Sequence, residues 1–138
     1  MKKILLATLL GALIVLCSAC ANQSDIPRGY VQKEEHFDED GFQDYVDYCK
    51  YTYADASKVQ NSPQFQKLTQ EQVEDIEDYF EKFKEFIEAE KRSDEYDFSP
   101  LCINEGDYAY IKSKDFENFT VLFFDTQSNV LYYIHANI

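Results

Sequence analysis

Two cysteines in the body of the chain, Cys49 and Cys102, could be oxidised to a disulfide. In the chain-entropy model, a disulfide that closes the long loop between Cys49 and Cys102 would stabilise the fold by about 4 kcal/mol. Cys49 also lies on an apolar stripe, where a free thiol packs as a small hydrophobe. The sequence is therefore compatible with two alternatives, a disulfide between Cys49 and Cys102 or two free thiols. Neither cysteine has a neighbour in the sequence that would activate it as a nucleophile.

The two histidines, His36 and His135, are the next candidates for chemistry. A histidine can act as a general base or a metal ligand, but a metal site needs further ligands at defined spacing. The sequence has no G-x-S-x-G, no H-E-x-x-H and no glycine-rich phosphate loop. We therefore predict no cofactor and no metal. An enzymatic function is considered only as an alternative, namely a small envelope hydrolase that uses carboxylates or His135.

The acidic stretch 36–47 partly resembles an EF-hand calcium loop when Gly41 is aligned with the loop's invariant glycine. His36 then stands where the first aspartate is expected, and Asp47 where the bidentate glutamate is expected. An acidic start of a helix explains the stretch better than a calcium site does.

The N-terminus has the pattern of a secretory leader. Lys2 and Lys3 precede an apolar run from Ile4 to Cys17. As a helix, this run would span roughly 21 Å, which is short of the ~30 Å hydrocarbon core of a bilayer. The run is therefore expected to be an export signal rather than a permanent span.

The end of this leader, Cys17-Ser18-Ala19-Cys20, resembles the lipobox of bacterial lipoprotein signals. The resemblance implies cleavage before Cys20, acylation of Cys20 with fatty acids such as palmitate, and a lipid anchor at the extracytoplasmic face of the cell membrane. Cys17 departs from the leucine usual at its position. The competing interpretation is plain secretion after cleavage behind Ala21. The expected organisation is a signal peptide over 1–19, a flexible tether over 20–29 and one domain over 30–138.

The chain is strongly acidic, with 13 Lys+Arg against 26 Asp+Glu and a formal net charge of −13. Such a chain repels phosphate backbones, so we expect no nucleic-acid partner. The aromatic content of 16% is enough to build a packed core.

Two helices are predicted in the first part of the domain. Apolar residues recur at helical spacing over 42–53 and again over 70–91. The second segment begins with Thr69-Gln70-Glu71-Gln72, which has the form of a capping box.

Four runs with strand character follow, at 96–103, 107–112, 119–124 and 130–135. Their short connections favour an antiparallel arrangement, and Gly106 can take a left-handed turn position. The expected fold is therefore α+β, with two main helices packed on a four-stranded antiparallel β-meander.

The last two runs are apolar on both faces, although one face of an antiparallel sheet is usually solvated. Either the chain covers both faces, or one face is an aromatic partner-binding surface. The residues predicted to bind a partner are exposed tyrosines: Tyr48 and Tyr51, which fall off the apolar stripe of the helix predicted over 42–53 and should be partly exposed, and Tyr108 and Tyr110 on the sheet.

The assembly as a whole resembles small bacterial lipoproteins of unknown function, which pair a lipobox with an acidic α+β domain ending in strands such as Leu131-Tyr132-Tyr133-Ile134-His135. The favoured function is a non-enzymatic extracytoplasmic binding domain, with an envelope protein or ligand as the unknown partner. A cation-binding acidic protein is a third, weaker hypothesis.

Overall fold

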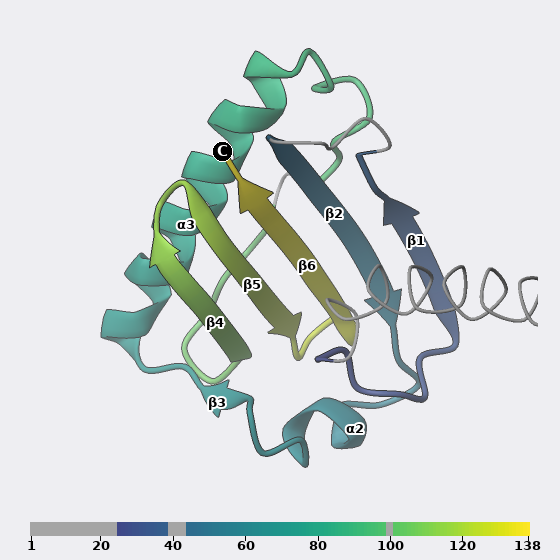
Figure 1. The fold of residues 1–138 in the computed structure, drawn as a ribbon. Coiled ribbons are helices and arrows are strands. Elements are labelled where there is room, and N and C mark those ends of the chain that lie inside the picture. Colours follow the sequence, from purple (N-terminus) through teal and green to yellow (C-terminus); the bar gives the residue numbers. More distant parts are fainter. Residues whose placement is uncertain (1–24, 39–43, 99–100) are drawn as a thin grey trace, which may run out of the picture.

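The computed structural model describes residues 25–38, 44–98 and 101–138. In this part of the chain, one long helix lies across a six-stranded antiparallel sheet (Figure 1). The strands are β1 (Gln32–His36), β2 (Tyr45–Thr52), β3 (Gln66–Lys67), β4 (Tyr108–Asp115), β5 (Asn118–Asp125) and β6 (Val130–Asn137), and the helices are α2 (Ser57–Gln60) and α3 (Gln70–Ala89).

The strand order is β1-β2-β6-β5-β4-β3. Strands β4, β5 and β6 form the expected antiparallel meander, and residues 126–129 connect the β5–β6 hairpin. β6 then pairs with β2, with Tyr48 opposite Ile134. The strand at the C-terminal end of the chain therefore lies in the middle of the sheet.

The predicted fold of two main helices on a four-stranded meander is wrong. The segment 42–53 was expected to be helical, but its described residues form β2. Tyrosine, valine and threonine dominate this segment, and such residues favour strands. Both faces of β2 are buried, so apolar residues occur on both faces. Their spacing along the chain happens to match the period of a helix.

The predicted strand over 96–103 is also wrong, because the described residues there form no strand. Their apolar side chains pack against the sheet and α3 instead of alternating along a ladder. Pro100 in this segment lacks a backbone N–H, which also disfavours a paired strand.

The long helix is confirmed as α3, which ends two residues earlier than predicted. Thr69 caps it through a complete capping box, in which the Thr69 hydroxyl oxygen accepts from the Gln72 backbone N–H and the Gln72 side chain accepts from the Thr69 N–H. Gly106 takes the expected left-handed conformation, with φ +95°.

Both faces of the sheet are buried. On the α3 face, the core consists of helix residues, residues of the facing strands and a few loop residues: Val46, Tyr48, Leu68, Val73, Ile76, Phe80, Phe83, Ile87, Phe98, Ala109, Phe119, Val121, Phe123, Ile134 and Ala136. On the opposite face, Ile26, Val59 and Phe65 pack against strand residues that include Cys49, Tyr51, Leu122, Phe124, Leu131 and Tyr133. The chain itself therefore covers the second face, and the hypothesis of an exposed aromatic sheet surface is abandoned.

The packed domain starts before Tyr30. Ile26 is buried in the second core, the Pro27 carbonyl accepts a 2.6 Å hydrogen bond from the Tyr53 hydroxyl, and Gln64 donates to the Asp25 carbonyl. Residues 25–27 thus belong to the packed domain rather than to the tether predicted over 20–29.

Candidate functional site

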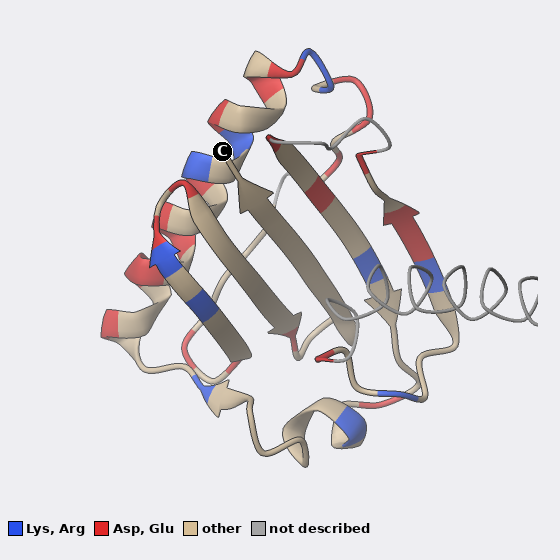
Figure 2. Ribbon diagram, in the orientation of Figure 1, with Lys and Arg blue, Asp and Glu red and all other residues tan. Residues whose placement is uncertain are grey.

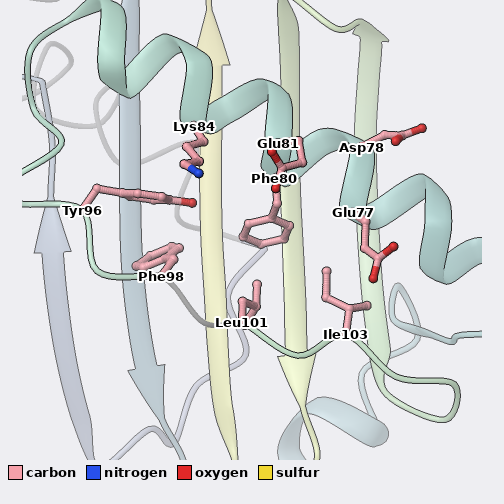
Figure 3. A pocket seen from close by; sticks show the side chains of 9 residues that line it. All are labelled: Glu77, Asp78, Phe80, Glu81, Lys84, Tyr96, Phe98, Leu101 and Ile103. Atoms are coloured by element: carbon pink, nitrogen blue, oxygen red, sulfur yellow. The ribbon is translucent and has the colours of Figure 1, made fainter.

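A groove runs between α3 and a segment made of residues 96–98 and 101–103, which lies on the same face of the sheet (Figure 3). Its volume is about 480 Å³. We call this segment the groove wall. The lining residues are Glu77, Asp78, Phe80, Glu81 and Lys84 from the helix and Tyr96, Phe98, Leu101 and Ile103 from the wall.

The helical period places apolar and charged residues at different depths of the groove. Phe80 is buried and packs against Phe123 of the sheet, with ring centroids 6.2 Å apart. Glu77 and Glu81 are four residues apart, so they lie one turn from each other on the same side of α3 and are exposed. The groove therefore has an apolar floor and an acidic rim on the helix side.

Aromatic contacts hold the first half of the groove wall against the sheet. The Phe98 ring is buried and meets Tyr48 and Tyr132 edge-on, with centroids 5.5 and 5.2 Å apart. Tyr96 packs on Tyr48 and on Phe83 of α3. Burial raises the pKa of the Tyr96 hydroxyl, and the nearby Glu81 carboxylate adds to this shift.

Polar contacts fix both ends of the groove wall. Before it, the Arg92 guanidinium donates a 2.7 Å hydrogen bond to the Val46 carbonyl. After it, the Asn104 backbone N–H donates to the buried Asp107 carboxylate at 3.0 Å. The wall is therefore attached to β2 at one end and to the start of β4 at the other.

The rim carboxylates have no ion-pair partner among the residues described. Lys82 pairs with Glu85 at 2.8 Å, and Lys50 pairs with Asp97 at 2.7 Å. No such pair involves Glu77, Asp78, Glu81 or Lys84 within the described ranges. Figure 2 shows acidic residues along the outer side of α3. Three carboxylates against one lysine leave the rim with a negative charge.

The groove is lined by a small set of polar groups beside its apolar floor. Among the described residues, its lining contains three carboxylates, one amine and one phenol. Its acids all come from one face of a single helix, whereas a carboxylate pair for acid–base hydrolysis must flank the reacting bond.

His135 lies on the opposite face of the sheet and does not line the groove. Its ring nitrogens lie 2.7 Å from the Thr120 hydroxyl and 3.0 Å from the Tyr45 hydroxyl. Burial lowers the pKa of the His135 imidazole, and the charge of Lys112 lowers it further. Burial raises the pKa of the neighbouring Asp47 carboxyl. Burial thus favours the neutral form of the His135 imidazole, which lies in a hydrogen-bonded cluster.

The two cysteines of the domain are both free. Cys49 is buried on the second face of the sheet, where burial raises the pKa of its thiol to about 12. Cys102 is exposed in the groove wall. Of the two alternatives left open by the sequence, the structure has the free thiols.

The four tyrosines predicted to bind a partner do not form one surface. Tyr48 and Tyr51 are on opposite faces of β2 and are buried, so the expectation that they would be partly exposed is wrong. Each reaches a carboxylate, Tyr48 at Glu95 and Tyr51 at Glu35. Tyr108 and Tyr110 are half-buried at the edge of the second core.

Other predicted features lie partly or wholly outside the described residues. Cys20, the leader over 1–19 and the central part of the calcium-loop-like stretch, including Gly41, belong to this group. In the described ranges, no cluster of three or more metal-ligating side chains occurs. Nor is any helix of these ranges long and apolar enough to cross a membrane.

Sequence reasoning missed the groove because it assigned 96–103 to the sheet. The signal that could have revealed it is Pro100 within an apolar run that follows a long amphipathic helix. Such a run can lie on the face of the sheet that the helix covers without pairing with any strand.

No family model, no curated protein and no solved structure matches this chain.

Proposed function

We propose that the chain is a lipid-anchored extracytoplasmic binding protein, attached to the membrane through Cys20, whose domain binds a ligand in the groove between α3 and the groove wall. It works without catalysing a reaction. The observation that carries the binding function is the groove itself, which has an apolar floor of Phe80, Phe98 and Leu101 and is open to solvent at a charged rim. The anchor is inferred from the resemblance of residues 17–20 to a lipobox.

A concave, largely apolar site with a few polar groups at its edge is the usual form of a ligand-binding site. The groove wall is fixed at both ends and packed through Tyr96 and Phe98, which favours a site formed before the ligand arrives. A preformed site avoids the cost of ordering the chain on binding.

The anchor is tested by growing bacterial cells that express the full chain with labelled palmitate. Label should enter the wild-type protein and Cys17→Ser, which keeps the acceptor cysteine, and should be absent from Cys20→Ser. Equal labelling of Cys20→Ser would refute the lipid anchor at this position.

The groove is tested with the neutral apolar dye Nile red, whose fluorescence rises in apolar surroundings. Leu101→Ser introduces a hydroxyl into the groove and should weaken dye binding. Val31→Ser is the matched control, because Val31 is 69% exposed and outside the groove. Equal fluorescence of the two variants would count against a ligand site in the groove.

A further inference from the structure

The ligand's chemistry can be inferred from the way the rim and floor of the groove are combined. We propose that the groove binds a segment of a partner protein in which lysine or arginine residues alternate with apolar side chains. This inference rests on the proposed function, since it names the class of ligand for the same groove. The basic residues would face the rim carboxylates, and the apolar side chains would lie over Phe80 and Leu101.

The rim charges are arranged in a way that is unfavourable for the free protein. Glu77 and Glu81 are like charges one helical turn apart, a spacing that destabilises a helix. Lys82 is four residues after Asp78 and could neutralise it, but its ammonium pairs with Glu85, away from the groove. The rim is therefore left with negative charge that a cationic ligand can neutralise.

The floor excludes simple cations as the preferred ligand. A bare metal ion needs several converging oxygen ligands, and the described residues contain no cluster of that kind. Phe80, Phe98, Leu101 and Ile103 offer carbon surface instead. Only a ligand that combines positive charge with apolar groups uses both parts of the groove.

The dimensions of the groove suit a short stretch of polypeptide. From Glu77 to Lys84, α3 rises by roughly 10 Å. An extended chain covers that length in about three residues. One or two apolar side chains could enter the groove while neighbouring basic residues reach the rim. The chain's net charge of −13 would also attract such a segment from a distance.

The test uses fluorescence anisotropy with three short labelled peptides. One alternates lysine with leucine, one alternates glutamate with leucine, and one alternates lysine with serine. We expect the lysine–leucine peptide to bind at least tenfold more tightly than either of the others. Leu101→Ser should weaken its binding.

Matched variants separate the rim from the general charge of the protein. Glu77→Gln/Glu81→Gln removes two rim charges, whereas Glu71→Gln/Glu74→Gln removes two exposed charges of α3 that do not line the groove. The rim variant should bind the lysine–leucine peptide about tenfold more weakly, and the control variant should change affinity less than twofold. Equal losses in both variants would show non-specific attraction and overturn the inference.

The outcomes distinguish this inference from the proposed function. If the glutamate–leucine peptide binds as tightly and loses affinity in Leu101→Ser, the groove is a ligand site but the cationic preference is wrong. The same holds if no peptide binds while Nile red still responds to Leu101→Ser. If no peptide binds and Leu101→Ser leaves the fluorescence of Nile red unchanged, both proposals fail.

Discussion

The Asp107 carboxylate joins two turns that are distant in the sequence, because one of its oxygens accepts both the backbone N–H of Thr126 at 3.0 Å and the Thr126 hydroxyl at 2.7 Å. Its other oxygen accepts from the Asn104 backbone N–H. The end of the groove wall is thereby tied to the β5–β6 hairpin. Asp107 is only 2% exposed, so these donors would find no replacement in solvent if the carboxylate were removed.

Asp107→Ala should therefore lower the free energy of unfolding by about 3 kcal/mol, since it leaves several donors without an acceptor. Asp107→Asn retains one acceptor oxygen and should lose less. Urea denaturation measures both. Asp125→Ala is the control, because Asp125 accepts solvent-exposed bonds from the same hairpin turn, and its loss should be smaller. An Asp107→Ala variant as stable as Asp125→Ala would contradict the structural role of Asp107.

Phe98→Ala should destabilise the domain by about 3–5 kcal/mol, because a buried phenyl ring is replaced by a cavity. Phe98 is 5% exposed and contacts Tyr48, Tyr96 and Tyr132. Phe116→Ala is the matched control, since Phe116 is 47% exposed and should cost about 1 kcal/mol or less. Thermal unfolding followed by circular dichroism gives both values. Similar losses in both variants would show that the groove wall is not packed as described.

The parts of the fold that sequence reasoning predicted correctly are those with a strong local signal. α3 combines a capping box at Thr69 with a single apolar stripe, and the β5–β6 hairpin combines two β-rich runs with a short polar connection. In these elements, local preference and tertiary environment agree.

The helix wrongly predicted over 42–53 arose because a strand that is buried on both faces lacks the alternation of apolar and polar residues by which a strand is recognised. β2 lies between β1 and β6 with a core on each face, so its side chains carry no polar alternation and its type could not be read from periodicity. β1 was missed for the opposite reason. It is a polar edge strand, Gln32–His36, whose charged residues are typical of protected sheet edges. The groove depends on how residues 96–98 and 101–103 pack on the sheet, which is a long-range relation that local patterns do not contain.

The two free thiols should differ sharply in reactivity. Cys102 is exposed and should be alkylated by iodoacetamide in the native protein, whereas Cys49 is buried with a thiol pKa of about 12 and should react only after unfolding. Mass-spectrometric mapping of the modified peptides, with and without urea, checks this. Rapid native labelling of Cys49 would contradict its place in the core.

His135 should make the domain less stable as the pH falls from neutral. Its folded pKa is lowered below the ordinary value of 6.5, so between these two pKa values the unfolded chain binds more protons than the folded one. The melting temperature should therefore fall as the pH drops through about 6.5, and His135→Gln should show a smaller decrease. The same pH slope in both proteins would rule out this assignment.

Neutralising the rim should stabilise the free protein. Glu77→Gln/Glu81→Gln removes a repulsive pair one turn apart and should raise the free energy of unfolding by about 0.2–0.5 kcal/mol. Lys82→Gln breaks the pair with Glu85 and should act in the opposite direction. Denaturant unfolding at low salt measures both changes, and high salt should reduce them. A less stable rim variant would mean that the carboxylates have partners in the folded state.

The place of β6 in the sheet has a consequence for the order in which the chain can fold. Among the strands that the structure describes, the β1–β2 hairpin pairs with the rest of the sheet only through β6, residues 130–137. A growing polypeptide that has emerged only as far as α3 thus holds β2 without its inner neighbour, and the sheet cannot be completed before residues 130–137 have been synthesised. Until then, the edge of β2 that pairs with β6 in the folded sheet has no partner strand.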